Sequence, residues 1–403
     1  MKPSSPPLSA QAASLTVCLV CNTGFAIYTY RQGVIRMLVA KGVRVVVLAP
    51  RDRTFPLLEE MGCVCIDLPV ASKGTNPLAD LRTLAALYRH YRTIRPDVVF
   101  HYTIKPNIYG SVAAWLARVP SIAVTTGLGY VFIQKSRAAS VAKALYRFAF
   151  RFPREVWFLN RDDHSAFLDE RLLAHPDRAK LLHGEGVDID YFALTPLPRA
   201  PRVTFVLIGR LLWDKGVAEY VDAARMLRSR YPHACFQLLG PVGVDNPSAI
   251  TKADVDGWSK EGVIEYLGEA HDVRPTIAAA DCVVLPSYRE GVPRTLMEAS
   301  AMGRPIVATD VPGCREVVAD GVTGLLCEAK RAESLAEKLA QVLDMSESER
   351  RNMGLRGREK VTAEFDEALV VERYRQTLLA LTGANVFERR AAPSAGPEWG
   401  KQR

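Results

Sequence analysis

Long apolar runs are missing from this chain of 403 residues. A membrane-spanning helix needs about 20 consecutive apolar residues, whereas a typical apolar run here, residues 45–49, is only long enough for a strand. The apolar stretch at residues 15–21 follows a leader rich in Pro, Ser and Ala, and we interpret it as a first β-strand, not as a signal peptide. We therefore expect a cytoplasmic protein whose ends, residues 1–14 and 383–403, are disordered.

The cysteine pattern is not that of a disulfide-rich or zinc-binding protein. Most of the eight cysteines lie in apolar, strand-like runs: Cys18, Cys21, Cys63, Cys65, Cys235 and Cys282. Cys18 and Cys21 have the spacing of a metal-binding knuckle, but residues three apart on a strand point to opposite faces. We expect buried free thiols, with no disulfide and no structural zinc.

Acidic side chains are absent from residues 135–154, although the chain as a whole is only moderately basic, with a net charge of +8. Residues 1–190 contain 24 Lys and Arg against 15 Asp and Glu, whereas the rest contains 28 against 29, so the excess lies in the first half. The basic residues of the acid-free segment are Lys135, Arg137, Lys143, Arg147, Arg151 and Arg154. The aromatic residues interleaved with them are Tyr146, Phe148, Phe150 and Phe152.

This basic, aromatic segment suits an anionic membrane surface or a lipid that carries a pyrophosphate. A solvated surface helix would show the same pattern, so both interpretations stay open. No motif of a nucleic-acid-binding module accompanies the segment, and we expect no nucleic acid as a partner.

Short β-rich runs alternate with helical periods along the chain, a pattern typical of parallel sheets covered by helices. The strands predicted in the first half are residues 15–21, 43–49, 63–67, 97–102, 120–125 and 155–159. The helices predicted between them include residues 28–41, 78–94 and 106–117. A second series of strands is predicted at residues 203–208, 234–239, 263–267, 282–286 and 305–308.

A Pro-rich break at residues 195–201 separates the two series and is interpreted as an interdomain linker. The predicted fold class is therefore α/β, with two Rossmann-like domains at residues 15–194 and 200–365 and a final helix at 366–382. Ligands of such open sheets bind at the carboxyl ends of the strands. Both domains can therefore face one central cleft.

The first candidate site follows the first strand, where Asn-Thr-Gly-Phe-Ala-Ile occupies residues 22–27. Backbone amides near Gly24 could contact a phosphate or a sugar. A plain tight turn would have the same composition, and the segment alone does not distinguish the two.

The second domain opens with a strand that ends at Gly209, and Arg210 and Lys215 lie just beyond its carboxyl end. Two fixed cations at this place could neutralise a diphosphate leaving group without a metal. As isolated residues they would more often be ordinary surface charges.

Residues 285–299 form a strand, a turn and a helix, with Pro293 predicted at the first helical position. The free amides and the dipole at a helix start bind anions. Glu290 and Glu298 are eight residues apart, which on a helix places them on similar faces about 12 Å apart. That distance matches the span of a nucleotide sugar, so one carboxylate could hold the sugar hydroxyls and the other the ribose hydroxyls.

These motifs, together with Gly-Val-Asp-Ile-Asp-Tyr-Phe at residues 186–192, resemble a family-4 retaining glycosyltransferase of the GT-B fold. The resemblance covers about residues 15–382. The segments at residues 102–110 and 126–130 resemble the bacterial subgroup that extends undecaprenyl-diphosphate-linked sugars in surface polysaccharide or glycan assembly.

The resemblance implies that Arg210 and Lys215 bind the donor diphosphate, that Glu298 binds the ribose and that Glu290 binds the transferred sugar. The donor-binding residues predicted in this way are Gly24, Gly209, Arg210, Lys215, Glu290, Gly291, Val292, Thr295 and Glu298. It also implies a UDP-sugar donor, retention of the anomeric configuration, and a departing phosphate that deprotonates the acceptor hydroxyl. The final helix would pack on the first domain, and no cofactor or obligatory metal is expected.

One departure from the family concerns the first domain. Many relatives have a His three residues before the position of Lys105, and here Tyr102 occupies it. His101 lies one residue earlier and should point to the other face of its strand. We predict Lys105 as a catalytic cation alongside Arg210, Lys215 and Glu290. The weaker predictions for the acceptor and membrane side are His101, Asn107, Gly127, Gly129, Lys143, Arg147, Arg151 and Arg154.

Asp188 and Asp190 have the Asp-x-Asp form with which metal-dependent glycosyltransferases of another fold hold Mn²⁺ or Mg²⁺. In the segment before the linker, a hinge or capping role is favoured.

Two other functions fit the same architecture. A nucleotide-sugar 2-epimerase would convert UDP-sugar without an acceptor, and a non-catalytic binding module would not need the four charged residues of the second domain.

Overall fold

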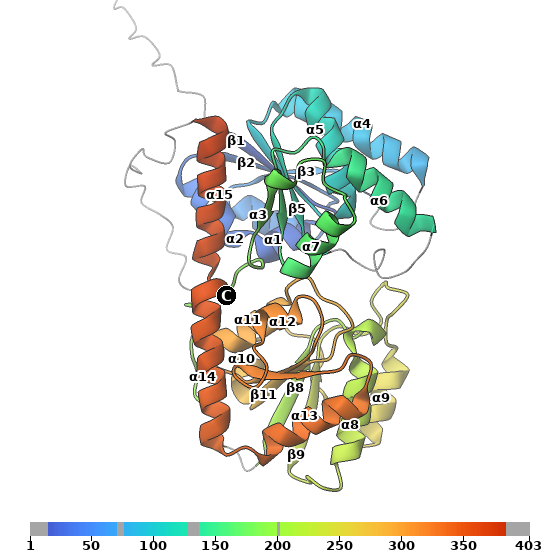
Figure 1. The fold of residues 1–403 in the computed structure, drawn as a ribbon, viewed down its shortest axis with the longest axis vertical. Coiled ribbons are helices and arrows are strands. Elements are labelled where there is room, and N and C mark those ends of the chain that lie inside the picture. The colour runs from blue at the N-terminus through green and yellow to red at the C-terminus, as the bar shows by residue number, and fades with distance from the viewer. Residues whose placement is uncertain (1–14, 71–75, 128–136, 200–201, 384–403) are drawn as a thin grey trace, which may run out of the picture.

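The computed structural model describes residues 15–70, 76–127, 137–199 and 202–383. The chain forms two α/β domains, one above the other in Figure 1, each built on a sheet that helices flank. The predicted fold class is confirmed. The predicted disordered ends, residues 1–14 and 383–403, lie outside the described residues except for Gly383, which ends the last helix.

The first sheet has seven strands in the order β3-β2-β1-β4-β5-β6-β7, all parallel. They are β1 (Thr16–Val20), β2 (Arg44–Ala49), β3 (Val64–Asp67), β4 (Val98–Tyr102), β5 (Ser121–Thr125), β6 (Glu155–Phe158) and β7 (Ala179–Leu181). Every residue of β1, β4 and β5 is buried, because helices cover both faces of a parallel sheet. That burial explains why these strands are continuous apolar runs in the sequence.

The helices of the first domain are α1 (Gly24–Tyr30), α2 (Gln32–Ala40), α3 (Phe55–Glu60), α4 (Pro77–Ile94), α5 (Ser111–Ala117), α6 (Arg137–Ala149) and α7 (Arg161–Asp169). The single helix predicted at 28–41 is wrong, because Arg31 leaves the helical conformation and divides it in two. The helix predicted at 106–117 begins as a π-helical turn, Pro106–Gly110, before α5.

The second sheet has the order β10-β9-β8-β11-β12-β13 and is also parallel. Its strands are β8 (Val203–Ile208), β9 (Ala234–Leu239), β10 (Glu265–Tyr266), β11 (Cys282–Leu285), β12 (Ile306–Thr309) and β13 (Gly324–Cys327). Its helices are α8 (Val217–Leu227), α9 (Lys252–Lys260), α10 (Arg274–Ala279), α11 (Arg294–Ala301), α12 (Cys314–Val317), α13 (Ala332–Asp344) and α14 (Glu347–Glu364). The strand predicted at 263–267 is much shorter than expected.

In each sheet the strand order reverses at the first strand, so β1 lies between β2 and β4, and β8 lies between β9 and β11. Ligands of open parallel sheets bind at the carboxyl ends of the strands beside such a reversal. The fold therefore directs attention to the loops after β1, β4, β8 and β11.

The last helix, α15 (Glu367–Thr382), returns to the first domain and runs along its side (Figure 1). The hydroxyl of its Tyr374 hydrogen-bonds the hydroxyl of Tyr102 on β4 at 2.9 Å. Near its start, Glu367 accepts a hydrogen bond from the backbone N–H of Gly33 at 3.0 Å. The end of the chain thus ties the second domain to the first. No helix among the described residues is long and apolar enough to cross a membrane.

Candidate active site

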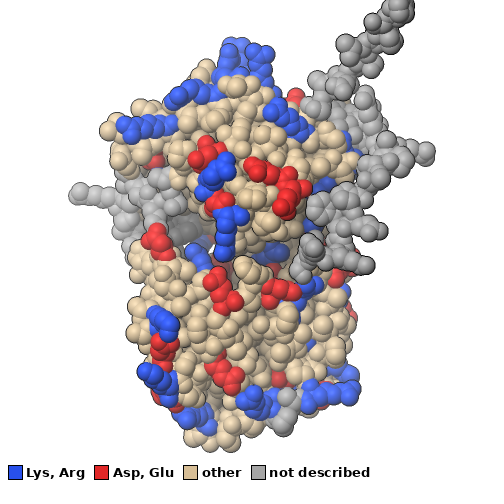
Figure 2. Space-filling view, turned by 180° about the vertical axis from the view of Figure 1, so that it is seen from behind, with Lys and Arg blue, Asp and Glu red and all other residues tan. Residues whose placement is uncertain are grey.

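A cavity of about 420 Å³ lies between the two domains. Figure 2 shows from behind that the waist of the molecule is hollowed, with acidic and basic side chains mixed along the rim. The second-domain residues that line the cavity include Gly209, Arg210, Lys215, Glu290, Gly291, Val292, Arg294 and Thr295. The first-domain residues that line it include Tyr30, Arg31, Tyr102, Thr103, Thr126 and Glu185.

Lys215 ends a short 3-10 turn that follows β8. The next residue, Gly216, has φ of 72°, and a Cβ at this position would overlap the carbonyl oxygen of Pro286. Only glycine adopts this conformation in this space, so the loops after β8 and β11 approach closely. The Nζ of Lys215 consequently forms an ion pair with Glu290.

Arg210 is exposed and lines the cavity. Within the described part of the chain, its guanidinium has neither an ion-pair partner nor a hydrogen-bond acceptor. A free guanidinium next to a paired ammonium leaves donors available for an anion such as a diphosphate.

Helix α11 begins at Arg294, and Pro293 is the residue before it. The prediction that Pro293 opens the helix is therefore wrong by one residue. Glu290 lies in the loop that precedes the helix, so the predicted helical spacing between Glu290 and Glu298 is also wrong. In this loop Gly291 packs closely on the first domain, since a Cβ there would lie 2.6 Å from the carbonyl oxygen of Thr126.

Glu298 lies on α11 and is only 7 % exposed. Its Oε1 accepts a hydrogen bond from Arg294 Nε at 2.6 Å. Burial raises the pKa of the Glu298 carboxyl above its usual value, and the charge of Arg294 partly offsets that effect. Arg294 also donates to the carbonyl oxygen of Thr29 on α1, and it lines the cavity, whereas Glu298 does not.

Sequence reasoning missed Arg294, although it stands between the two predicted glutamates. Its guanidinium lies 5.6 Å from the ring of Tyr30, so it contacts both domains at once. The hydroxyl of the neighbouring Thr295 is 3.5 Å from the carbonyl oxygen of Ile208. The start of α11 is therefore held at the end of β8.

Gly24 does not line the cavity, although its neighbours Phe25 and Ala26 do. A Cβ on Gly24 would lie 2.8 Å from an oxygen of Asp52, and that carboxylate already accepts the N–H of Phe25 at 2.8 Å. A glycine is therefore required here by packing, and the first-turn amide of α1 at Phe25 is satisfied by a side chain of the same domain.

The first-domain side of the cavity is a buried polar network. Arg31 is 2 % exposed and forms an ion pair with Glu185, which is 7 % exposed. The guanidinium lies 4.4 Å from the centre of the Tyr102 ring. The hydroxyl of Tyr102 bonds Tyr374 of α15. Tyr102 thus joins the cavity to the final helix. Sequence reasoning did not find Arg31 or Glu185, which are 154 residues apart.

His101 is completely buried and does not line the cavity. Its Nε2 hydrogen-bonds the hydroxyl of Tyr91 on α4 at 2.9 Å, and its ring packs against the backbone of Gly110. Burial lowers the pKa of the imidazole to about 3, so the ring is neutral at physiological pH. These contacts are those of a structural histidine.

Lys105 and Asn107 are not brought to the cavity. The Nζ of Lys105 is 2.8 Å from a carboxylate oxygen of Asp80 on α4. The side-chain amide of Asn107 donates to the carbonyl oxygen of Val124 at 2.9 Å. Thr103 lines the cavity instead, with φ of 68°, a conformation that is strained for a β-branched residue.

Gly127 faces the second domain, since a Cβ on it would lie 3.5 Å from the Cα of Gly291. Gly129 lies outside the described residues.

Asp188 accepts hydrogen bonds from the N–H groups of Asp190 at 3.2 Å and Tyr191 at 2.9 Å, so the predicted capping role is confirmed. In residues 15–70, 76–127, 137–199 and 202–383, no three His, Cys, Asp or Glu side chains are grouped as metal ligands would be.

The basic segment is helix α6 and the residues that follow it. Lys143 pairs with Glu170 at 2.7 Å, and Arg147 donates to the carbonyl oxygens of Glu170 and Arg171 at the end of α7. Arg151 and Arg154 are exposed. Helix α5 adds Trp115, which is 53 % exposed and stacks on Phe152 with ring centres 4.5 Å apart. The side chains of residues 135 and 137 are not among those that the structure describes.

Two families match the chain. Residues 25–184 match the family described as "Glycosyl transferase 4-like domain", and residues 202–345 match "Glycosyl transferases group 1". These ranges coincide with the two α/β domains on either side of the cavity.

Individual proteins are similar over most of the chain. The N,N'-diacetylbacillosaminyl-diphospho-undecaprenol alpha-1,3-N-acetylgalactosaminyltransferase of Campylobacter jejuni is 27 % identical, over 89 % of this chain and 97 % of its own. The UDP-Gal:alpha-D-GlcNAc-diphosphoundecaprenol alpha-1,3-galactosyltransferase of Escherichia coli is 25 % identical, over 69 % of this chain and 74 % of its own. The crystal structure of a Rickettsia africae glycosyltransferase has the same fold, with a TM-score of 0.74 at 17 % identity over 92 % of this chain and 99 % of that one.

Proposed function

Because the chain is a glycosyltransferase of the GT-B fold, with a transferase 4-like domain ahead of a group 1 domain, we propose that it extends a lipid-linked saccharide in polysaccharide or glycan assembly. The sugar would be a hexose or an N-acetylhexosamine from a nucleotide-diphosphate donor, preferably UDP. The acceptor would be a saccharide on undecaprenyl diphosphate, the class named for the Campylobacter jejuni and Escherichia coli relatives.

The observation that carries the proposal is the arrangement of charges at the start of α11. The guanidinium of Arg210, which has no partner among the described residues, and the Nζ of Lys215 lie at the cavity together with Glu290. The first amides of α11 and the positive end of its dipole add to this anion site. A donor diphosphate bound there would have its sugar beside Glu290 and its ribose beside Glu298.

The reaction that the family resemblance implies is compatible with this placement. The bond between the anomeric carbon and the donor phosphate breaks while a bond forms to the acceptor oxygen on the same face of the sugar. The departing phosphate takes the proton of the acceptor hydroxyl, so the anomeric configuration is retained and no separate base is required. Arg210 and Lys215 stabilise the charge that develops on the diphosphate. We propose that these two cations make a divalent metal unnecessary.

Glu298 would receive the ribose hydroxyls only after Arg294 shares its hydrogen bond or moves. Both residues stand on α11 four positions apart, and we propose that a rotation of the Arg294 side chain opens the carboxylate to the cavity. The donor site would thereby form as the nucleotide enters.

The surface near α5 and α6 is suited to contact the membrane that holds the lipid part of the acceptor. Exposed Arg151 lies 5.9 Å from the ring of Phe148. Exposed Arg154 is two residues after Phe152, whose ring stacks on the exposed ring of Trp115. Cations attract anionic lipid head groups, and aromatic rings insert at the membrane interface. We propose peripheral attachment to the cytoplasmic face of the plasma membrane through this surface.

The test is a donor screen with UDP-, GDP- and TDP-sugars against a polyprenyl-diphosphate-linked sugar. The proposal expects a lipid-linked product whose new linkage has the anomeric configuration of the donor, measured by NMR. Conversion of a UDP-sugar without any acceptor would favour the epimerase, and the absence of transfer from every donor would reject the proposal.

A further inference from the structure

The loop that carries Glu290 is held by the first domain. Asn160, the residue before α7, donates its side-chain N–H to the carbonyl oxygen of Gly291 at 2.8 Å. On the opposite side, Gly313 of the second domain packs against the same carbonyl so closely that a Cβ would overlap it. The peptide after Gly291 is therefore enclosed between the starts of α7 and α12.

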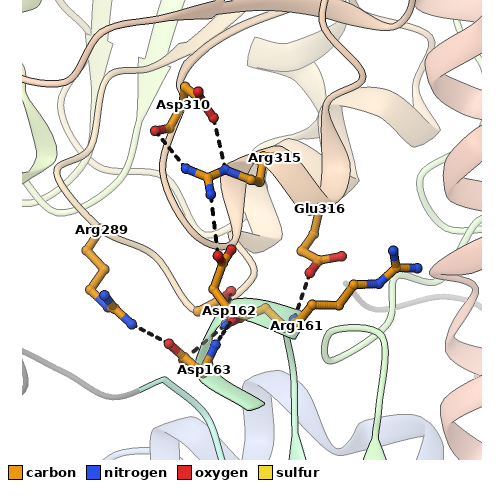
Figure 3. Close-up of polar contacts among 9 residues, drawn as sticks. Arg161, Asp162, Asp163, Arg289, Asp310, Arg315 and Glu316 are labelled. Carbon is orange, nitrogen blue, oxygen red and sulfur yellow. Dashed lines mark hydrogen bonds and ion pairs between the residues drawn. The ribbon is translucent and has the colours of Figure 1, made fainter. Parts of the chain in front are cut away.

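The residue before Glu290 is held in the same way. Arg289 forms an ion pair with Asp163 of α7 (Figure 3). The Asp163 side chain is 1 % exposed and that of Arg289 is 25 % exposed. An ion pair with one nearly buried partner is stronger and less screened by salt than a pair on the surface.

Asn160 and Asp163 form one unit at the start of α7. The side-chain oxygen of Asn160 accepts the N–H of Asp163 at 2.7 Å, and its amide donates to the Asp163 carboxylate at 3.0 Å. Asn160 is completely buried. Because each side chain fixes the other, the unit presents one donor to Gly291 and one acceptor to Arg289 in a defined geometry.

Two further contacts between the domains are more exposed to solvent than those of Asn160 and Asp163. Arg315 is 3.3 Å from Asp162, and these side chains are 42 % and 36 % exposed. The backbone N–H of Arg161 donates to Glu316 at 2.8 Å. Arg315 also pairs with Asp310 of its own domain at 2.9 Å (Figure 3). An exposed pair with an alternative partner contributes little free energy.

We propose that Asn160 and Asp163 are positioning residues for sugar transfer, because they fix the Arg289–Gly291 segment, and with it Glu290, when the two domains close. Neither residue lines the cavity. Their effect on the sugar passes through Gly291 and Arg289, which adjoin Glu290 on both sides. The inference rests on the proposed function, in which Glu290 binds the transferred sugar.

Sugar transfer and donor binding should depend on different contacts. Arg210 and Lys215 belong to the second domain, so nucleotide binding does not require the contacts to α7. The orientation of Glu290 does require them. A displacement of about 1 Å in a reacting geometry costs on the order of 100-fold in rate.

The decisive comparison is Asp163→Asn with Asp162→Asn, the same substitution at neighbouring residues of one helix. We expect Asp163→Asn to lower kcat by about 100-fold and to leave the Kd for UDP, measured by calorimetry, at the wild-type value. Asp162→Asn should keep the wild-type kcat. Equal kcat values for the two variants, or a Kd for UDP that weakens in parallel with kcat, would overturn the proposal.

Arg289 provides a second variant, because its partly exposed side chain can be replaced with less risk to folding. Arg289→Gln should lower kcat as Asp163→Asn does, and Arg289→Lys, which keeps the charge, should restore part of it. Small-angle scattering with UDP present should give a larger radius of gyration for Arg289→Gln than for the wild type.

The scattering measurement does not depend on knowing the substrates. If the wild-type enzyme transfers no sugar, the proposed function fails, and the radius of gyration still decides whether these contacts hold the domains together. A radius equal to that of the wild type in both Arg289→Gln and Asp163→Asn would overturn the role of the α7 contacts.

Discussion

The two sides of the interdomain cavity use charge in different ways. On the second-domain side, Lys215 and Glu290 are 22 % and 12 % exposed, and Arg210 beside them is exposed with no partner among the described residues. On the first-domain side, Arg31 and Glu185 are 2 % and 7 % exposed and are enclosed by Tyr102 and Tyr374. Partly exposed charges can exchange partners with a ligand, whereas a buried pair holds the shape of its surroundings.

This difference separates binding from scaffolding within one cavity. A buried ion pair is strongly destabilised when one partner is removed, because the other charge is left without compensation. A partly exposed pair regains water when a partner is lost, so its removal changes ligand binding more than stability. Substitutions on the two sides should therefore have different consequences.

The largest effect is expected on the second-domain side. Lys215→Ala removes a cation from the charge that develops on the leaving diphosphate and should lower kcat by about 100- to 1,000-fold, with little change in the midpoint of thermal unfolding. Lys252→Ala, which removes an exposed lysine of the same domain, is the control and should keep full activity. Full activity of Lys215→Ala would refute its assignment to the diphosphate.

On the first-domain side, the expected effect is on stability. Arg31→Met leaves Glu185 buried without an opposite charge and should destabilise the first domain by about 3–5 kcal/mol, measured by denaturant unfolding. The double variant Arg31→Met/Glu185→Leu should recover much of that loss. If Arg31→Met unfolds like the wild type while donor binding fails, the division between the two sides is wrong.

A smaller effect is expected outside the cavity, at the surface formed by the residues that follow α6. Arg151→Gln/Arg154→Gln should weaken binding to anionic vesicles by about 1 kcal/mol per charge, measured by co-sedimentation. Arg147 is kept, because it holds the end of α7. Arg202→Gln/Arg230→Gln removes two exposed arginines of the second domain and should bind like the wild type. Equal binding of both double variants would reject the membrane surface.

The smallest effect concerns the pH dependence of donor binding. The pKa of Glu298 is raised by burial and partly restored by Arg294. As the pH falls through this raised pKa, the carboxylate is protonated and loses the charge that accepts the ribose hydroxyls, so the KM for the donor should rise. Arg294→Gln removes the opposing charge and should move this acidic limb to higher pH, whereas Arg294→Lys should move it less. An acidic limb at the same pH in all three proteins would contradict the assignment.

The second-domain side of the site was largely predictable because its residues are local in sequence. Arg210 and Lys215 follow one strand, and Glu290, Gly291 and Thr295 follow another. Because the carboxyl ends of parallel strands meet at one edge of the sheet, these residues are expected to lie close together. The exception was the relation of Glu290 to Glu298, since no sequence rule shows that the helix starts only after Pro293.

The first-domain side was not predictable, because its contacts join distant segments. Arg31 meets Glu185 across 154 residues, and Asn160 meets Gly291 across 131. Each is an ordinary polar residue in its local segment. Lys105 had a strong local pattern, yet its placement is decided by Asp80 on a neighbouring helix. The strand β7 was missed because a run of three residues has too little periodicity to identify, and the four-residue strand β13 was not predicted either.

The most direct test of the account is a crystal structure with UDP bound. We expect a diphosphate between Arg210, Lys215 and the first amides of α11, with the ribose hydroxyls on Glu298 after Arg294 has moved aside. A nucleotide bound away from the interdomain cavity, or phosphates that contact neither Arg210 nor Lys215, would contradict it.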